Sequence, residues 1–545
     1  MHLDINKNGS YTRTLLRTSY REDGKVKKKT IANLSDCSLE AIEAIQFGLK
    51  YYQKHLEGKL VDLDESPFLH GKSAGAVFAL VEIAKRIGLI KVLGNDKNGK
   101  LALWQIISRI LDQGSRLSSV RLHQSYLLST AIDLKSGFTE DNLYENLDWI
   151  ARNQSKIEQG LFKERHGNKK VELLLYDVTS SYLEGNFNAF ASYGYNRDGK
   201  KSKMQIVIGQ VCDKEGFPIS VQVFSGNTSD PKTFYDQIKK SIETFNCTHI
   251  TFVGDRGMIK SAQKKELSEA NLNYITALTK REINTLEKKR IIQLEMFDEN
   301  ICEIEHESIR YLLRNNPVRS DEIKNSRASK ERSIEQTLKI INEYLLKHKR
   351  AKPETGLKNI EKKIAKLNCT WLTAKIDNRK VLIIRDEEKL KEISRLDGCY
   401  VITTDLPKGR MSAKDVHCNY KNLAKVERAF RESKTGHLEV RPIHVRKENS
   451  TRGHVFVVMC AYLIRMVLSK YWVDLNITVE EGLKSLSTIS SVILTDAQGI
   501  KVEKIPRPTG ISEELLKKMN YCLPEVVVSK NINVDTRKKL NDNRK

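Results

Sequence analysis

The sequence lacks paired cysteines, a long apolar run and a signal-peptide pattern. Its nine cysteines are scattered without a Cys-x-x-Cys pair, which argues against a zinc site or a disulfide framework and for a reducing compartment. The longest apolar run, residues 455–464, has ten residues and is too short to span a bilayer. The first residues, Met-His-Leu-Asp-Ile-Asn-Lys, do not resemble a signal peptide. We therefore expect a soluble intracellular protein.

Positive charge is what the sequence has in excess. It contains 93 Lys and Arg against 69 Asp and Glu, a formal net charge of +24, and 39% hydrophobic residues. That hydrophobic fraction is enough for folded cores, and 545 residues correspond to roughly three or four domains. The charge favours a phosphate-rich partner such as nucleic acid. Charge alone is equally consistent with a basic soluble protein that has no such partner.

Strand and helix patterns alternate between residues 166 and 280. We predict strands at 171–178, 204–212, 217–224, 248–254 and 273–278, and helices at 231–244 and 260–270. Gly216 indicates a tight turn between the second and third strands, which makes that pair antiparallel. This order is typical of a ribonuclease-H-like α/β core, with a mixed five-stranded sheet and helices. In that topology the first and fourth strands are neighbours.

Three acidic residues stand at informative places in this pattern. Asp177 ends the apolar run of the first predicted strand, Asp255 ends that of the fourth, and Glu427 lies in the basic helical segment 420–434. Two carboxylates from neighbouring strands and one from a distant helix form an oxygen-ligand set suited to Mg²⁺ or Mn²⁺. Three acids that hold two metal ions support in-line attack at a phosphodiester.

Each acid also has an ordinary structural interpretation. Asp255 could cap the following helix, Asp177 could bond a neighbouring loop, and Glu427 could pair with Arg431 at i+4. The combination favours a site, because an unpaired carboxylate at the end of a buried strand is costly unless a cation balances it.

The regions before the core predict DNA binding. Residues 1–60 combine a basic β-hairpin, with its turn at Glu22-Asp23-Gly24, and a helix. Residues 61–165 have helical periodicity, and we expect a mostly helical DNA-binding domain there.

The regions after the first part of the core follow a different pattern. Residues 281–395 predict a mainly helical insertion with an antiparallel helical hairpin, whose Lys/Arg face is a possible DNA-contacting arm. Strands are predicted at 380–385 and 399–404, the core resumes over 396–480, and an apolar helix is predicted at 454–468. Residues 481–545 form a C-terminal region with a basic tail, 537–545. The hairpin rests on two apolar stripes: Ile334, Leu338, Ile341 and Leu345, answered by Leu357, Ile360, Ile364 and Leu367.

One segment resembles a family signature. Tyr420-x2-Leu423-x3-Glu427-x6-Lys434 is similar to the Y-x2-R-x3-E-x6-K signature of bacterial insertion-sequence DDE transposases, with Leu423 in place of the arginine. Further blocks resemble those around the first two aspartates of these enzymes, and the resemblance covers about residues 170–280 and 396–470. These blocks are Tyr176-Asp177-Val-Thr, Gly194-Tyr-Asn-Arg-Asp-Gly199, Gly226-Asn-Thr-Ser-Asp230 and Gly254-Asp-Arg-Gly-Met258.

The resemblance implies roles for the motif residues. Asp177, Asp255 and Glu427 are expected to be the catalytic, metal-binding triad, which holds two Mg²⁺ ions with Mn²⁺ as a substitute. Further side chains are expected to contact DNA, and an arginine of the helix is expected to bind the phosphate that Leu423 cannot bind. These are Tyr420, Lys434, Arg431, Arg428 and Arg256.

The activity implied is DNA transposition in the bacterial cytoplasm, at the nucleoid. The enzyme is expected to bind the terminal inverted repeats of its element, to cleave them, and to join the freed 3′-OH to target DNA as a homodimer in a synaptic complex. Two alternatives remain open: a ribonuclease-H-like DNA nuclease without strand transfer, and a catalytically inactive, transposase-derived DNA-binding protein.

Overall fold

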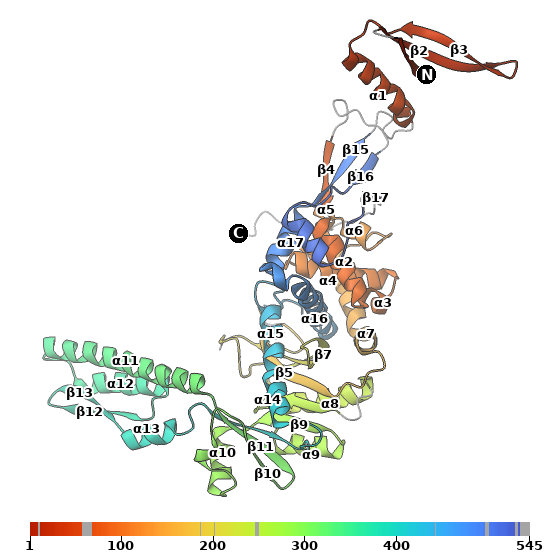
Figure 1. Cartoon of the computed structure of the whole chain (residues 1–545). Helices are drawn as coiled ribbons and strands as arrows, with labels where there is room; N and C mark the ends of the chain where they lie inside the picture. The colour runs from red at the N-terminus through yellow and green to blue at the C-terminus, as the bar shows by residue number, and fades with distance from the viewer. Residues whose placement is uncertain are drawn as a thin grey trace. The chain divides into compact units, whose positions relative to one another are not determined.

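The structure is a computed structural model that describes residues 1–8, 11–56, 68–185, 187–200, 202–245, 250–441, 443–495, 501–528, 532 and 534 (Figure 1). The chain forms two compact units. Unit 1 comprises Met1–Arg86, Asn95–Leu143 and Val467–Lys545, and unit 2 comprises Ile87–Gly94 and Tyr144–Met466. The predicted basic tail, 537–545, lies outside the described residues. The predicted division into six regions stays a prediction.

Unit 1 begins with a three-stranded antiparallel sheet of strands β1 (His2–Asn8), β2 (Tyr11–Glu22) and β3 (Lys25–Asn33). The β2–β3 hairpin confirms the predicted turn, because Asp23 and Gly24 have φ values of 49° and 70°, as a tight two-residue hairpin turn requires. Strand β1 was not predicted. Helix α1 (Leu39–Leu56) follows and contacts β1.

The rest of unit 1 joins two distant parts of the chain. A four-stranded sheet has the order β17-β16-β15-β4, so the C-terminal strands pair with a strand near the start of the region 61–165, for which only helices were predicted. Helix α17 packs on α2 so closely that a Cβ on Gly75 would collide with the backbone carbonyl oxygen of Leu486. The elements are β4 (Phe68–Ser73), α2 (Gly75–Arg86), α4 (Lys97–Leu111), α5 (Arg116–Ser125), α6 (Leu128–Ala131), η2 (Val473–Leu475), α17 (Val479–Ser487), β15 (Ser490–Thr495), β16 (Lys501–Lys504), α18 (Ile511–Lys518) and β17 (Val526–Val527).

Unit 2 is built on one mixed sheet of eight strands in the order β10-β11-β14-β9-β8-β5-β6-β7. The five predicted strands are present, but a five-stranded sheet was wrong, because β14 pairs with β9 and carries β11 and β10 with it. The strands are β5 (Leu173–Tyr182), β6 (Gln205–Asp213), β7 (Pro218–Ser225), β8 (Thr251–Gly254), β9 (Asn273–Ala277), β10 (Cys302–His306), β11 (Ile309–Asn315) and β14 (Cys399–Thr404).

Strand pairing around β5 decides where the acids lie. Strands β5 and β8 are parallel neighbours, as predicted, and β6 pairs antiparallel with both β5 and β7. The prediction that the first strand ends at 178, one residue after Asp177, was wrong. Its antiparallel partner β6 is longer than β8 and holds β5 in the sheet as far as Tyr182, opposite Gln205.

Helices cover the sheet of unit 2. Helices α8 (Asp230–Phe245) and α9 (Ser261–Glu269) pack on the face that bears Leu174, Tyr176 and Val178. Side chains alternate along a strand, so Asp177 lies on the opposite face of β5. Helix α15 (Leu423–Lys434) packs on β5 and β6. Other helices of this unit are α3 (Leu89–Leu93), α7 (Glu140–His166), which begins in unit 1, α10 (Lys280–Lys288), η1 (Leu294–Met296) and α14 (Ala413–Lys421).

Helix α16 (Glu448–Tyr471) is apolar throughout its middle. Among the described residues it alone has the length and composition to cross a membrane, and most of its apolar window is buried, as in the core helix of a soluble protein. It crosses α7 closely at Gly453, where a Cβ would meet the Leu147 backbone. The predicted helix at 454–468 is therefore longer than expected at both ends.

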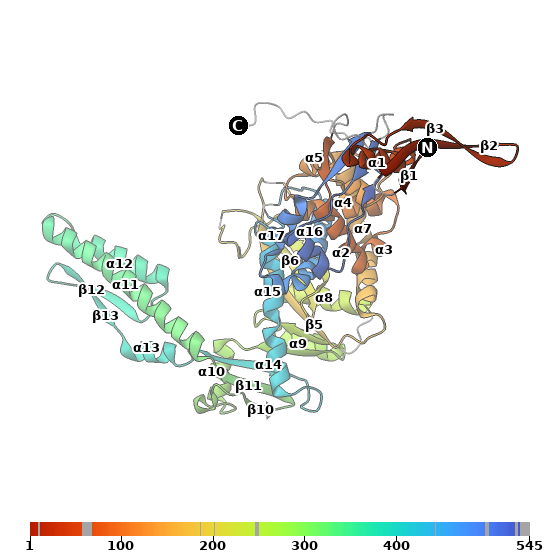
Figure 2. The same ribbon diagram turned by 45° about the horizontal axis from the view of Figure 1, so that its top comes forward.

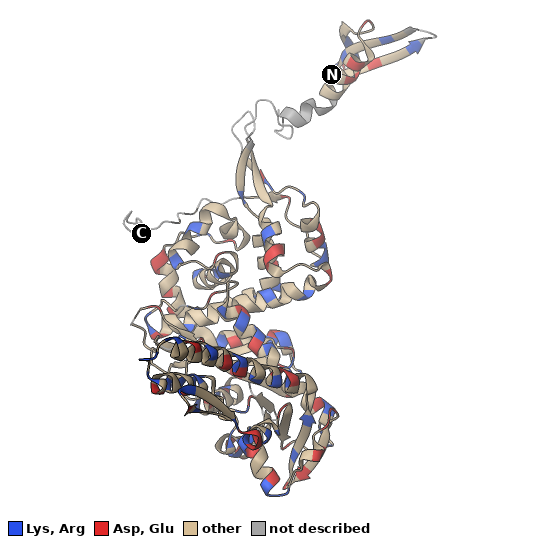
Figure 3. Cartoon of the chain, turned by 90° about the vertical axis from the view of Figure 1, so that its left-hand side faces the viewer, with Lys and Arg blue, Asp and Glu red and all other residues tan. Residues whose placement is uncertain are grey.

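The predicted insertion contains the helical hairpin, formed by α11 (Pro317–Lys347) and α12 (Pro353–Leu367) (Figure 2). Buried Ile334, Leu345 and Ile360 form its core, which confirms the two apolar stripes. The prediction of a mainly helical insertion was incomplete. A β-hairpin of β12 (Leu372–Asp377) and β13 (Lys380–Arg385) packs on the helices, and α13 (Glu387–Ser394) follows it. Lysines and arginines are interspersed with acidic residues along α11 and α12 (Figure 3).

Candidate active site

Two strands and one helix bring the three predicted acids together. The parallel register pairs Tyr176 of β5 with Gly254 of β8, so Asp177 and Asp255 occupy matching positions one residue beyond the last parallel pair. Glu427 lies on α15, the helix that packs on β5. Asp177 is half-buried, whereas Asp255 and Glu427 are exposed. The two aspartates thus lie at matching positions of neighbouring strands although 78 residues of sequence separate them (255 − 177 = 78).

The acids act on one another electrostatically. Burial, with a smaller contribution from the negative charges of Asp255 and Glu427, raises the pKa of Asp177 to about 7, while the backbone N–H of Val178 and the charge of Arg197 oppose the rise. Near neutral pH the Asp177 carboxyl is therefore poised between its two protonation states. A cation among the three acids would lower this pKa again.

The hydrogen bonds of the aspartates leave oxygens available. Asp177 Oδ1 accepts a bond from the Val178 backbone N–H at 2.7 Å, and Asp255 Oδ1 accepts one from the Arg256 N–H at 2.7 Å. The second oxygen of each aspartate accepts no hydrogen bond from any residue that the structure describes.

The ordinary interpretations of the acids do not hold. Helix α9 begins at Ser261, so Asp255 does not cap it. Glu427 and Arg431 are both described, and no ion pair joins them. Asp177 bonds its own neighbour Val178 and no distant loop. For Asp177, whose carboxyl is partly buried and has no cationic partner in direct contact among the described residues, a bound cation would relieve the cost of burial.

The side chains are not gathered into a formed metal cage. Within the described part of the chain, no group of three or more His, Cys, Asp or Glu side chains is close enough to hold a metal ion. The donor chemistry nevertheless fits a hard divalent cation, since all three candidates are carboxylates. The raised pKa of Asp177 has burial as its main cause, and the negative charges of Asp255 and Glu427 add to it.

Tyr420 contacts the acids directly. Its hydroxyl donates a hydrogen bond to Asp255 Oδ1 at 3.3 Å, and burial together with the charge of Asp255 raises its pKa. The predicted single helical segment 420–434 is two helices, α14 and α15, which meet at Asn422. The tyrosine hydroxyl therefore orients the Asp255 carboxylate, and the expected phosphate contact of Tyr420 stays a prediction.

Lys434 is engaged elsewhere. Its Nζ lies 2.9 Å from Asp198 Oδ1, and the Arg441 guanidinium lies 2.6 Å from the same oxygen. The Lys434 and Asp198 side chains are only 10% and 3% exposed, and burial lowers the pKa of Lys434. Asp198 Oδ2 also accepts a bond from the Tyr182 N–H at 3.3 Å. The ammonium therefore serves a buried ion cluster, and its expected phosphate contact stays a prediction.

The remaining DNA-contact candidates differ in availability. Leu423, which stands where the family signature has arginine, is 7% exposed at the start of α15. Arg428 pairs with Glu432 at 2.8 Å. Arg256 and Arg431 are exposed and form no ion pair with any described residue. Of the arginines of this helix, Arg431 is therefore the better placed to take the role of the signature arginine.

Sequence patterns indicated no role for Arg197, Asp198 or Asp230, although all three lie within the motif blocks. Arg197 Nη2 donates to both carboxylate oxygens of Asp230, at 2.6 and 2.7 Å, and Asp230 is the first residue of α8. Arg197 is also the cation that lowers the pKa of Asp177. A basic residue inside a block that accompanies a catalytic aspartate was the available signal.

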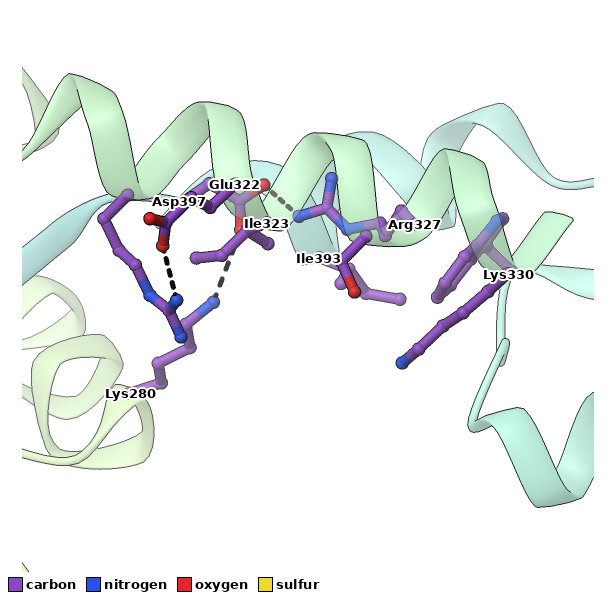
Figure 4. A pocket seen from close by; sticks show the side chains of 10 residues that line it. Lys280, Glu322, Ile323, Arg327, Lys330, Ile393 and Asp397 are labelled. Carbon is purple, nitrogen blue, oxygen red and sulfur yellow. Dashed lines mark hydrogen bonds and ion pairs between the residues drawn. The ribbon is translucent and has the colours of Figure 1, made fainter. Parts of the chain in front are cut away.

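A cavity of about 260 Å³ lies apart from the three acids, where the insertion joins the sheet (Figure 4). Asp397 is its buried anion and pairs with Lys280 at 3.6 Å and with Arg327 of α11. Trp371 forms part of the wall. These ion pairs connect α10 and α11 to the start of β14, which gives the cavity a structural explanation.

Comparison with known proteins identifies the class of enzyme. A family model described as "Transposase DDE domain" matches residues 169–464, more than half of the chain, so the chain belongs to the DDE transposases. A second model, "IS1634 family transposase, N-terminal domain", matches residues 4–62. The protein is therefore an insertion-sequence DDE transposase, an enzyme that cleaves DNA and transfers strands.

Two further comparisons add little. No curated protein matches the chain. A solved structure titled "Cryo-EM structure of piggyBac transposase synaptic complex with hairpin DNA (SNHP)" is similar over 75% of this chain and 78% of its own, with 10% identity and a TM-score of 0.37. That score is too low to support an argument.

Proposed function

We propose that Asp177, Asp255 and Glu427 are the catalytic triad of this transposase, set in a ribonuclease-H-like core. The observation that carries the proposal is the parallel register of β5 and β8, which aligns the two aspartates, with α15 packed on β5. Strand order supports the core, since β7-β6-β5-β8-β9 places the first and fourth strands together. The three strands beyond β9 are additions to that core.

The same acids would hold two Mg²⁺ ions, with Mn²⁺ as a substitute. When bound, such ions activate a nucleophile and stabilise the leaving oxygen of an in-line displacement. Asp177 and Asp255 each offer an oxygen without a hydrogen-bond partner among the described residues, and Glu427 is exposed toward them. Tyr420 restrains Asp255 through its hydroxyl, so that less side-chain freedom is lost when the site forms.

The proposed DNA partners are the terminal inverted repeats of the element and the target duplex, held by a homodimer in a synaptic complex at the bacterial nucleoid. The net charge of +24 supports strong phosphate binding. Four lysines of β3, at 25, 27, 28 and 29, lie on exposed positions of the basic hairpin. Exposed Arg256 and Arg431 are proposed to contact phosphates near the triad.

The test uses the DNA that flanks the gene, whose matching inverted repeats define the substrate. Asp177→Asn, Asp255→Asn and Glu427→Gln should abolish cleavage with Mg²⁺ as sole metal while end binding, measured by gel shift, changes less than about twofold. Retained cleavage in any one variant removes that residue from the triad.

The same substrate separates the alternatives. Precleaved ends with a free 3′-OH should be joined to target plasmid by the wild-type chain. Cleavage without joining would favour a nuclease, and binding without either reaction would favour an inactive DNA-binding protein.

A further inference from the structure

Three large aromatic side chains are exposed in the loop of unit 2 between β5 and β6. The loop connects β5 to β6 and projects from the sheet (Figures 1 and 2). Within it Phe187 is 74%, Tyr193 67% and Tyr195 82% exposed. Burial of a ring of this size is favourable, so three rings turned toward solvent in one loop need an explanation.

The backbone beneath the two tyrosines is firmly held. Gln205 Nε2 donates to the Tyr195 carbonyl at 3.1 Å and to the Gly226 carbonyl at 2.8 Å. Gly194, between the tyrosines, lies so close to Gly226 that a Cβ would collide with its carbonyl oxygen. Ser192 pairs with Gln205 through both backbone hydrogen bonds. The rings are therefore displayed from an anchored segment.

Arginines accompany the rings. The Arg197 guanidinium carbon lies 5.7 Å from the centre of the Tyr195 ring, and that of Arg446 lies 5.9 Å from the centre of the Phe187 ring. Arg197 is fixed by Asp230 and influences the pKa of Asp177. The loop is also attached to the strand and the helix that carry two of the acids, because the Arg197 backbone N–H donates to Ser180 Oγ of β5 at 2.9 Å and Asp198 pairs with Lys434 of α15 at 2.9 Å.

This combination fits one kind of partner. Exposed aromatic rings offer stacking faces to nucleobases, and neighbouring arginines attract phosphates. Bases in an intact duplex have their faces covered by stacking, so only unpaired bases could use the rings. An apolar peptide would gain nothing from the arginines.

We propose that Tyr193 and Tyr195, with Phe187 beside them, form a stacking surface for unpaired bases of the DNA strand next to the scissile phosphate. The proposal rests on the proposed function only in assigning that strand to the triad. It predicts a binding preference for bases as such, independent of cleavage.

The experiment measures base-dependent binding in a full-length chain that carries Asp177→Asn, so that no strand is cut. The probes are a fluorescent single-stranded oligonucleotide and an abasic strand of equal length, which has the same phosphates without bases. Titrations at raised salt weaken the phosphate contribution. The unmodified loop should bind the base-bearing strand more tightly than the abasic strand.

Tyr193→Ala and Tyr195→Ala should each reduce this preference on the order of tenfold. Tyr193→Phe and Tyr195→Phe should retain it, because stacking needs the ring and not the hydroxyl. The matched control is Tyr144→Ala, which removes a 43% exposed tyrosine on α7 and should leave the preference unchanged.

Three results would overturn the proposal: no preference for bases in the unmodified loop, no loss in the alanine variants, or an equal loss in Tyr144→Ala. Because the assay contains no cleavage step, failure of the triad assignment would show in the cleavage assay alone and leave this result standing.

Discussion

Two residues of helix α15, Glu427 and Lys434, differ in whether a neighbouring group compensates their charge. Glu427 is exposed, forms no ion pair with the described residues, and faces two further carboxylates. Lys434, seven residues later, is buried in a cluster with Asp198 and Arg441. Both residues belong to the same sequence signature. The comparison teaches that the uncompensated charge of Glu427 belongs to the proposed metal site. The compensated charge of Lys434 fixes the end of the helix that carries Glu427.

The largest expected effect is on the free energy of unfolding, through the ion cluster of Lys434, Asp198 and Arg441. Asp198→Ala leaves the largely buried Lys434 and the partly exposed Arg441 without their carboxylate and should reduce the free energy of unfolding by about 3–5 kcal/mol. The matched control is Glu432→Ala, which breaks the more exposed Arg428–Glu432 pair and should cost about 1 kcal/mol or less. Denaturant titrations of both variants make the measurement. Equal losses would show that the buried cluster contributes no more than a surface pair.

The next effect is a dependence of the free energy of unfolding on pH, caused by the carboxyl group of Asp177. The folded-state pKa of Asp177, about 7, exceeds its ordinary value of 3.8. The folded state therefore binds this proton more tightly, and stability falls as pH rises from about 4 to 7, by at most about 4 kcal/mol at 1.36 kcal/mol per unit. Without divalent metal, Asp177→Asn should flatten this decline in thermal unfolding. The same slope in both proteins would contradict the assignment.

A smaller effect is expected at Tyr420. Tyr420→Phe removes one hydrogen bond to Asp255, a loss of about 1 kcal/mol, and should slow cleavage roughly fivefold to tenfold with end binding unchanged. Single-turnover cleavage of a pre-bound end separates the two. Tyr462→Phe, on buried α16, is the control for loss of a tyrosine hydroxyl outside the acids. An unchanged rate in Tyr420→Phe would show that the contact to Asp255 has no role in cleavage.

The smallest effect separates two roles for Lys434. If its ammonium stays on Asp198, Lys434→Met should leave the salt dependence of end binding unchanged. If it leaves Asp198 to contact a phosphate, the slope should fall by about one unit. Arg431→Met, at an exposed cation, provides the comparison. A decrease for Lys434→Met as large as that for Arg431→Met would assign both cations of the last turn of α15 to DNA binding.

Local patterns predicted much of the core. Continuous apolar runs identified β5, β6 and β8, because strands buried on both faces carry little polar sequence. The helical hairpin of the insertion followed from its stripes at helical spacing. Strand β10 was missed because Cys302–His306 is short, charged and partly exposed, which gives it no apolar signature. Strand β11 was missed although its middle residues are buried, because its apolar run, Tyr311-Leu312-Leu313, is only three residues long and has an arginine on each side.

Partners distant in sequence were out of reach. Nothing near Lys434 indicates that its anion is Asp198, 236 residues earlier. Nothing in Phe68–Ser73 indicates pairing with Ser490–Thr495. The sequence did not explain why Leu423 stands where the family signature has arginine. The structure explains it in part, since a buried position at a helix start accepts leucine.

The sequence by itself determined the identities and the local settings of the three acids, because strand and helix periodicity depend on neighbouring residues. Only the tertiary structure decided which charges are compensated. Register aligned Asp177 with Asp255, burial raised the pKa of Asp177, and a distant loop neutralised Lys434. Electrostatic energy depends on distance and solvent exposure, and neither quantity is set until the chain has folded.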